Sequence, residues 1–175
     1  FCEELKLEDN CPKDVEKDEF DVYAKHFLLQ HKQSGEYAGT VRFVIPPEGV
    51  QAPGLPIEKY CLDCIDKKVI DLQRLKTGTY GEVSRLAVPA RFRRRAGEKG
   101  KPYIIDSPRT KNKTDQNRLF PYISVGLYLV CAALFVEKQL DYALIMAEPR
   151  LARAMARIGI RFERCGKIME YHGQR

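Results

Sequence analysis

The stretch Gly81–Val88, GEVSRLAV, constrains the fold most, because it has the composition of a buried strand and yet carries two charges. Glu82 and Arg85 lie inside the run, and burying either charge is costly unless it is paired and hydrogen-bonded. An arginine-rich segment, ARFRRR, follows at 90–95. The stretch therefore predicts a core strand whose charged side chains meet opposite charges from elsewhere in the chain.

Two other segments carry charges that suit this strand. EKDEFD contains Glu16, Asp18 and Asp21, and the strand-like GTVRFV contains Arg42. Arginine suits such pairing because its planar guanidinium holds a carboxylate through two hydrogen bonds. Two interpretations remain open: a structural ion-pair network, or a cleft that binds the amine and carboxylate groups of a substrate.

The spacing of the two strand charges adds a geometric condition. Glu82 and Arg85 are three positions apart, so a regular strand would direct them to opposite faces of the sheet. A β-bulge would be needed to bring both near one site.

The order of the remaining elements predicts an α/β layered sheet fed by an N-terminal hairpin. The end of a helix is expected at 1–7, the hairpin strands at 22–31 and 37–45, short helices at 57–64 and 67–75, a helix at 122–138 and a strand at 142–147. A helix is expected to open at Pro149, with closing strands at 160–164 and 167–171.

The helix that opens at Pro149 is expected to be amphipathic and to end at a Gly159 cap. Three apolar residues fall at i, i+4 and i+7 and should face the core, whereas three arginines fall on another, solvated side: Leu151, Met155 and Ile158 against Arg150, Arg153 and Arg157.

Length and composition indicate one soluble domain spanning 1–175, because the chain has 44% hydrophobic and 31% charged residues. The uncharged run 119–136 is near the shortest length of a membrane span, but the α/β pattern around it favours a buried core helix. Six scattered cysteines without a preceding signal peptide indicate reduced thiols in a cytoplasmic protein.

The segment 89–118 is a long basic insertion, expected to be functional or mobile, in a chain of net charge +6. Such a segment suggests an anionic partner, which could be a phosphate, a nucleic acid or an acidic protein. Nucleic acid is the least favoured of these, because the segment is punctuated by glycine and proline and shows no platform of stacked aromatic residues.

Other chemistry-bearing residues give weaker signals. Cys61-x-x-Cys64 resembles half of a zinc site, but no second pair has metal-ligand spacing, so no metal is predicted. His26 and His31 receive no catalytic role, and the chain contains no G-x-S-x-G motif.

Several segments, in this order and spacing, resemble a known group of enzymes: FCEEL at 1–5, EKDEFD at 16–21, GTVRFV at 39–44, EVSRLAV at 82–88 and EPRLARAMARIGIRFERCG at 148–166. The group comprises the acyl-homoserine-lactone (autoinducer) synthases, the N-acyl amino acid synthases and, most similar of all, the bacterial PEP-CTERM/exosortase-associated acyltransferases. All are relatives of the GNAT acyltransferase fold.

The resemblance implies a GNAT-like fold, with a central mixed, mostly antiparallel sheet flanked by helices and a splayed, bulged strand at 82–88. It also implies an N-acyltransferase that moves a fatty acyl group from a thioester to the amine of a small acceptor such as an amino acid. No tightly bound cofactor is implied, and the co-substrate would be acyl-CoA or acyl carrier protein. The basic insertion replaces the usual glycine-rich phosphate turn, which favours the acidic carrier protein.

Roles for individual residues follow from the same resemblance. Glu82 and Arg85 are the catalytic candidates, with Glu82 as the base. The acceptor would be bound by Glu16, Asp18, Asp21 and Arg42. The donor would be bound by Ser84, Leu86, Ala87 and Val88, with Arg91, Arg93, Arg94 and Arg95 at the mouth, and the acyl chain by Phe43, Leu127 and Val130. A non-catalytic module that binds acyl groups or carrier protein remains the alternative.

Overall fold

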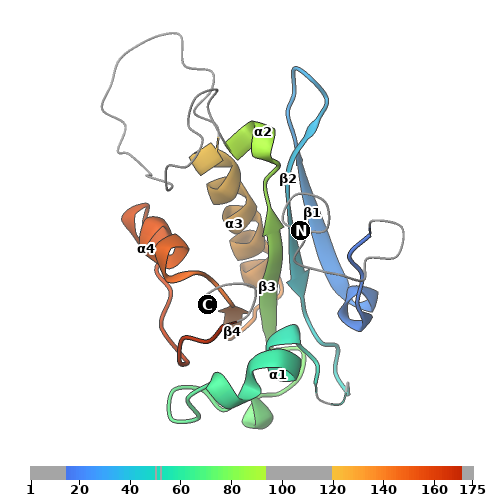
Figure 1. The fold of residues 1–175 in the computed structure, drawn as a ribbon. Helices are drawn as coiled ribbons and strands as arrows, with labels where there is room; N and C mark the ends of the chain where they lie inside the picture. The colour runs from blue at the N-terminus through green and yellow to red at the C-terminus, as the bar shows by residue number, and fades with distance from the viewer. Residues whose placement is uncertain (1–14, 50, 52, 94–119, 171–175) are drawn as a thin grey trace.

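The protein is built on one four-stranded sheet (Figure 1), seen in a computed structural model that describes residues 15–49, 51, 53–93 and 120–170. The strands are β1 (Ala24–Gln30), β2 (Tyr37–Val44), β3 (Tyr80–Ala87) and β4 (Tyr142–Ile145), and they lie in the order β1-β2-β3-β4. The first three pair antiparallel and β4 pairs parallel to β3. The sheet is therefore mixed and mostly antiparallel, as expected.

Helices flank this sheet. The α-helices are α1 (Pro56–Cys61), α2 (Ala90–Arg93), α3 (Phe120–Glu137) and α4 (Pro149–Arg157), and the 3-10 turns are η2 (Glu19–Val22), η3 (Leu62–Cys64) and η4 (Leu72–Arg74). The helix α3 packs chiefly on β2 and also touches β1 and β3. Figure 1 shows α3 running along the sheet, with α1 at the opposite end from α2.

Strand alternation divides the apolar side chains between two core clusters, one on each face of the sheet. Phe43 and Val83 join Leu127 of α3 in the first cluster. Val44 and Tyr80 join Phe20 of η2 in the second. Fully burying a large apolar side chain stabilises a fold by about 2 kcal/mol, so each cluster holds its own covering elements on the sheet.

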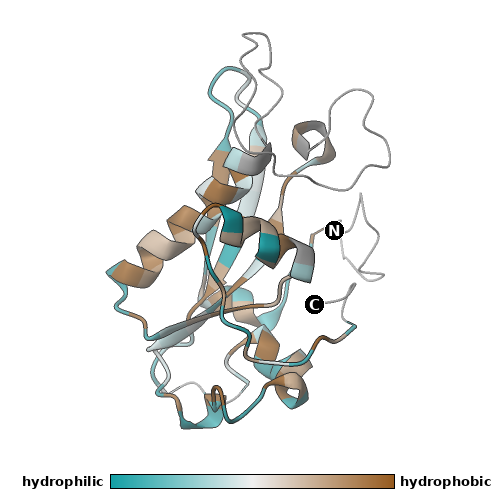
Figure 2. Ribbon diagram, turned by 90° about the vertical axis from the view of Figure 1, so that its left-hand side faces the viewer, coloured by the Kyte–Doolittle hydropathy of each residue, from teal (hydrophilic) through white to brown (hydrophobic). Residues whose placement is uncertain are grey.

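The apolar character of α3 extends around the whole helix, as Figure 2 shows by its brown colour. Its inner side is buried, with Leu127 only 1% exposed, whereas Leu129 is 56% exposed and Val136 72% exposed. The expected core helix is thus present, but only one side of it is covered by described residues. Within the described ranges, no helix meets the length and hydropathy needed to cross a membrane.

The prediction of two closing strands at 160–164 and 167–171 is wrong for the residues that the structure describes, which extend to 170. Gly166 forms only an isolated bridge with Ile65, flanked by hydrogen bonds from Lys167 N to Cys64 O and from Asp66 N to Cys165 O. Ile65 is the C-cap of the 3-10 turn η3, so its segment is too short to offer an extended strand edge, and Glu170 forms a second single bridge.

The helix expected at 67–75 is also wrong, because only the 3-10 turn η4 forms there. The Asp66 side chain accepts a hydrogen bond from Lys68 N at 2.9 Å, and Asp71 accepts one from Gln73 N at 3.2 Å. Aspartates that bond to the backbone two residues ahead favour turns over helix.

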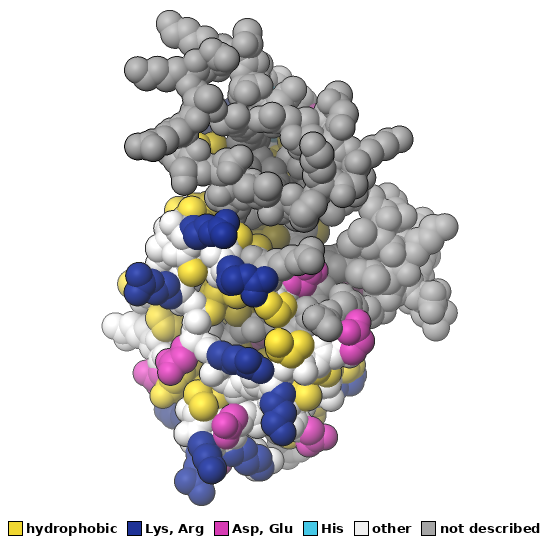
Figure 3. Space-filling model, turned by 60° about the vertical axis from the view of Figure 1, so that its left-hand side comes forward, with side chains coloured by type: hydrophobic (Ala, Val, Ile, Leu, Met, Phe, Trp, Pro, Cys, Tyr) yellow, Lys and Arg dark blue, Asp and Glu magenta, His cyan; other side chains and the backbone are white. Residues whose placement is uncertain are grey.

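The helix α4 confirms most of its expected pattern. Met155 is fully buried, Arg153 and Arg157 are exposed, and Gly159 follows with φ +92°. Ile158 is 39% exposed, contrary to expectation, because it is the C-cap and no longer holds helical geometry. Figure 3, which brings this side of the molecule forward, shows Lys and Arg spread among Asp and Glu, typical of a solvated surface.

Candidate functional site

The strand β3 leaves its parallel neighbour halfway along its length. Tyr80 to Val83 pair with Tyr142 to Ile145, and β4 then ends. The second half of β3, Ser84–Ala87, is half-buried and has no ladder partner on that side among the residues that the structure describes. The splayed strand expected at 82–88 is confirmed only from Ser84, because Glu82 and Val83 still pair with Leu144 and Ile145, and its unpaired part leaves backbone groups free to pair with something else.

A β-bulge lies at the start of this free half. Arg42 pairs with Ser84 and Thr40 with Ala87, so β3 has one more residue than β2 between these two pairs. Arg85 lies in the bulge with φ +51°, in the left-handed region. The bulge brings the Arg85 side chain to the face that carries Glu82 and Ser84, which is the geometry that the spacing of the two charges required.

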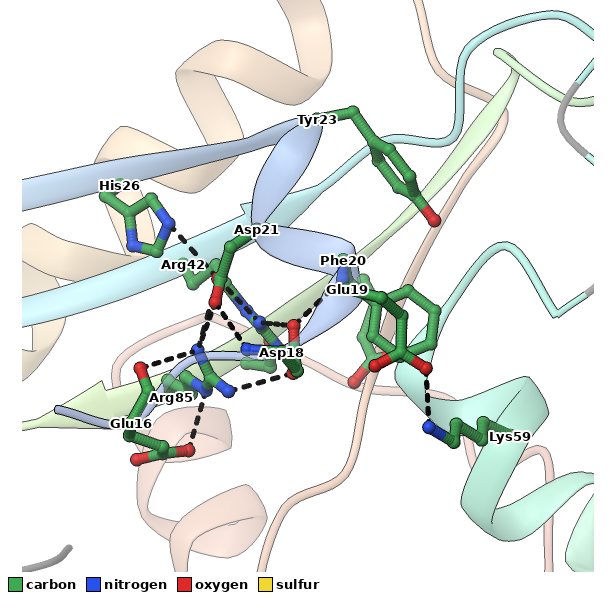
Figure 4. A network of polar contacts seen from close by, with 12 residues as sticks. Glu16, Asp18, Glu19, Phe20, Asp21, Tyr23, His26, Arg42, Lys59 and Arg85 are labelled. Atoms are coloured by element: carbon green, nitrogen blue, oxygen red, sulfur yellow. Dashed lines mark hydrogen bonds and ion pairs between the residues drawn. The ribbon is translucent and has the colours of Figure 1, made fainter. Parts of the chain in front are cut away.

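The charged side chains meet in one network on this face (Figure 4). The Arg85 guanidinium contacts Glu16 at 2.6 Å, Asp18 at 2.8 Å and Asp21 at 3.0 Å. The Arg42 guanidinium contacts Asp18 at 2.8 Å and Asp21 at 2.9 Å, and its Nε donates to Ser84 Oγ at 3.0 Å. The sequence thus predicted correctly that these charges come together.

The turn η2 holds the two aspartates of the network in place. Asp18 is its N-cap and accepts a hydrogen bond from Phe20 N, and Asp21 accepts one from Asp18 N at 2.8 Å. Phe20 is fully buried and anchors the turn in the second core cluster. This capping arrangement fixes both carboxylates before any ligand binds.

Pairing sets the charge states of the network. Burial alone would raise the pKa of Asp21, but the hydrogen bond from Asp18 N and the guanidinium groups of Arg42 and Arg85 outweigh it and lower the pKa to about 2. Burial alone would lower the pKa of Arg42, but hydrogen bonds to Asp21 and Asp18 raise it. Both arginines are therefore engaged by carboxylates, and the Arg42 side chain is only 3% exposed.

Glu82 lies next to the network but is fully buried. Its Oε2 accepts a hydrogen bond from Ile57 N of α1 at 2.7 Å, and its Oε1 has no hydrogen-bond partner among the described residues. Burial raises the pKa of Glu82 to about 8, against the opposing effects of Ile57 N–H and Arg42. The carboxyl is thus mostly protonated at neutral pH, and its role as a base stays a prediction.

A second buried carboxyl group, Glu58, was not singled out from the sequence. It accepts hydrogen bonds from Tyr80 Oη at 3.0 Å and from Leu55 N at 3.1 Å. The leucine N-cap of α1 has no polar side chain, so Glu58 at position N3 satisfies the free backbone donors instead. A glutamate two residues after Pro56 was the sequence signal for this role.

His26 is the other residue that the sequence did not assign. It lies on β1 opposite Arg42, and its Nε2 is 3.3 Å from Asp21 Oδ1. Its side chain is 49% exposed, more than any of the side chains that it joins in the network, which are Glu16, Asp18, Asp21, Arg42 and Arg85. The register of the hairpin, worked out from the turn at 33–36, was the signal that could have placed it beside Arg42.

The remaining predicted contacts stay predictions. Phe43 and Leu127 are buried in the core between the sheet and α3, with Val130 packed at its margin. Arg91 and Arg93 lie in α2, and Arg94 and Arg95 fall outside the described residues, as does the rest of the basic insertion to 118.

The Cys61-x-x-Cys64 pair shows no metal-site geometry. Cys61 is buried, lies 2.9 Å from the Met146 sulfur, and burial raises the pKa of its thiol to about 11. Over the part of the chain that the structure describes, no three His, Cys, Asp or Glu side chains are grouped as metal ligands.

Comparison with known proteins gives one family. Residues 1–100 match the family model described as an acetyltransferase (GNAT) domain. A solved acetyltransferase from Trypanosoma brucei is similar at 7% identity and a TM-score of 0.43, over 86% of this chain and 71% of that one. No curated protein matches the sequence.

Proposed function

This chain belongs to the GNAT acetyltransferase domain family, and on that premise we propose that it is an N-acyltransferase that moves a fatty acyl group from a thioester to a small amine. The observation that carries this proposal is the free edge of β3 at Ser84–Ala87, beside the bulge and the charged network. Enzymes of this family take an acyl-CoA co-substrate and hold no tightly bound cofactor.

The donor would bind along the free edge of β3. Its pantetheine arm carries amide groups that can pair with the backbone of Ser84–Ala87 on the side without a ladder partner, as an added strand does. The backbone N–H groups near Leu86 to Val88 would then lie where the oxyanion of the tetrahedral intermediate forms.

Acyl carrier protein is the favoured carrier of this donor. The arginines at 91 and 93–95 follow the free edge directly in the sequence, and the insertion up to 118 adds further basic residues. Carrier proteins are strongly acidic, so a basic rim at the mouth would speed their docking.

The acceptor would bind over the charged network through its ammonium group. Three carboxylates, those of Glu16, Asp18 and Asp21, face two guanidiniums, so the network carries excess negative charge. Arg42 is too buried to hold an acceptor carboxylate, whereas Arg85 is 18% exposed. The predicted acceptor role of the acidic residues is thus better supported than that of Arg42.

The test is an acyl-transfer assay with the purified protein. Fatty acyl-CoA and acyl carrier protein donors are offered with a panel of amino acids and other small amines, and free thiol and N-acylated products are measured. We expect amine-dependent thiol release, faster with the carrier protein. The resemblance of the sequence to N-acyl amino acid and autoinducer synthases predicts an N-acyl amino acid or a lactone among the products.

A non-catalytic binding module remains the second candidate, because the buried Glu82 carboxyl is largely protonated at neutral pH. That candidate predicts donor binding without thiol release for every amine offered. Glu82→Gln tests the base role itself: full turnover in this variant would remove Glu82 from the chemistry.

A further inference from the structure

Resting on the proposed acyl transfer, we propose that His26 is the catalytic base that removes the proton from the acceptor ammonium, with Asp21 holding its imidazole in place. Histidine is the side chain best suited to gain and lose a proton near neutral pH. Glu82 is fully buried and bonded to Ile57 N, so its carboxyl does not face an acceptor that arrives from solvent.

The register of the sheet places His26 in line with the free edge. His26 pairs with Arg42 across β1 and β2, and Arg42 pairs with Ser84 across β2 and β3. Neighbouring strands are about 5 Å apart, so the His26 and Ser84 backbones are separated by roughly 10 Å across this face. Asp18 and Asp21 cover Arg42 on this face, so the acceptor nitrogen would lie over these carboxylates, with the imidazole on one side and the donor thioester on the other.

Contacts with Asp21 leave one ring nitrogen available. Nε2 is 3.3 Å from Asp21 Oδ1, and Nδ1 has no partner among the described residues. Hydrogen bonds from Asp18 N and the Arg42 and Arg85 guanidiniums fix the aspartate, which stays ionised down to acid pH. A carboxylate at Nε2 favours the tautomer that is protonated there, and so leaves the Nδ1 lone pair free to accept a proton.

The charges around His26 come from three elements. Asp21 approaches from η2, Arg42 lies opposite on β2, and Arg85 of β3 contacts the far side of the same aspartate. Glu82 is fully buried and bonded to Ile57 N, so it does not share the solvent-facing side. The half-exposed imidazole is the member of this group that can exchange its proton with water.

The proposed step balances in protons. Nδ1 of His26 takes one proton from the acceptor ammonium, and the neutral amine attacks the thioester carbon to form the C–N bond. The C–S bond breaks as the tetrahedral intermediate collapses, and the remaining proton lost from nitrogen goes to the leaving thiolate. His26 then releases its proton to water.

The test compares His26→Gln with His31→Gln in the purified protein. His31 follows β1, bonds Ser34 Oγ at 2.9 Å and lies outside the network, so it controls for loss of a histidine near this hairpin. General-base catalysis contributes about 10²–10⁴-fold. We expect His26→Gln to lower kcat/KM about 100-fold or more, to lose the acidic limb of the pH profile and to regain activity with added imidazole. His31→Gln should stay within about twofold of the unchanged enzyme.

The outcomes separate this inference from the proposed function. If the unchanged protein is active and His26→Gln keeps full kcat/KM and the same acidic limb of the pH profile, the role of His26 is overturned and the proposed function is not. An unchanged protein that transfers no acyl group from any donor overturns the proposed function. Should His26→Gln unfold, ¹⁵N NMR of the unchanged protein decides: protonation at Nδ1 of neutral His26 contradicts the proposal, and protonation at Nε2 supports it.

Discussion

Arg85 has both an unusual backbone conformation and several ion pairs in the site. It takes a left-handed φ of +51° at the bulge and contacts three carboxylates. The left-handed conformation costs a non-glycine residue roughly 1–2 kcal/mol, so the contacts of the guanidinium hold a conformation that the backbone alone disfavours.

Arg85→Ala and Arg85→Gly separate these two contributions. Both variants remove the guanidinium that pairs with Glu16 and leave Asp18 and Asp21 facing Arg42 alone, so we expect both to be less stable by about 3 kcal/mol or more. Glycine tolerates positive φ, so Arg85→Gly should be the more stable of the two by about 1 kcal/mol. Urea unfolding measures the difference, and equal stability would contradict strain at the bulge.

Glu82 makes stability depend on pH in a defined direction. Burial raises its pKa to about 8 in the folded protein, whereas a glutamate in an unfolded chain titrates near 4.3. Above that value the unfolded chain is ionised while the folded chain keeps the proton, so the contribution of Glu82 is full below about pH 4 and is lost as the pH rises towards 8.

Glu82→Gln should remove this dependence. We expect the free energy of unfolding of the unchanged protein to fall by up to about 1.4 kcal/mol per pH unit between roughly pH 5 and 8 because of this group. The curve for Glu82→Gln should be flatter over the same range. Parallel curves from denaturant unfolding at several pH values would contradict a protonated buried carboxyl.

Close packing between β2 and β3 depends on a glycine. A Cβ atom at Gly81 would lie 2.7 Å from Val44 O and even nearer to the Phe43 ring. Backbone cannot move aside as a flexible side chain can, so we expect Gly81→Ala to destabilise the fold by about 2–3 kcal/mol.

Gly126→Ala in α3 is the matched control. A Cβ there would be 3.4 Å from Leu29 Cδ1, an ordinary contact, and alanine favours helix over glycine by about 1 kcal/mol. Thermal unfolding should therefore show a lower Tm for Gly81→Ala and an unchanged or higher Tm for Gly126→Ala. The opposite order would mean that β2 and β3 are not packed as closely as the structure shows.

Local patterns predicted the elements better than they predicted how the elements meet. The hairpin follows from two runs of strand-forming residues around the turn at 33–36, α3 and β4 from apolar runs, and α4 from helical periodicity and a proline at its start; all of these are short-range signals. The helix predicted at 67–75 did not form because the Asp66 and Asp71 side chains bond to the backbone and favour turns. The strands predicted at 160–170 did not form because no strand edge of the described residues lies beside Gly166 for an apolar segment to pair with.

The sequence predicted which charged residues form the site, but not the contacts between them. Charges in strands implied partners, and those partners are the carboxylates of 16–21. The bulge that unites Glu82 and Arg85 was required by their spacing, but only the family resemblance supplied it as an expectation. His26 and Glu58 were missed because their positions depend on strand register and helix capping across the chain.

The molecule as a whole combines a site from its first half with a scaffold from its second. The family match covers 1–100, which contains β1 to β3 and the charged network, whereas α3 and β4 follow later in the chain. Because β4 ends at Ile145, the later half also determines how much of β3 stays unpaired.

Charge reversal of Arg91, Arg93, Arg94 and Arg95 to glutamate tests the carrier-protein partner. We expect kcat/KM with acyl carrier protein to fall about tenfold or more at low salt, with a smaller effect at high salt, because surface attraction is screened. Acyl-pantetheine, which lacks the acidic protein, serves as the control donor and should be little affected. Equal losses with both donors would contradict docking by this rim.

The most direct measurement is amide hydrogen exchange with a non-cleavable acyl-pantetheine thioether bound. A donor that pairs with the free edge of β3 should slow exchange at Ser84–Ala87, while the outer edge of β1 at Ala24–Gln30, which is also an edge strand, keeps its rate. Unchanged exchange at Ser84–Ala87 under saturating thioether would contradict a donor site formed where β3 parts from β4.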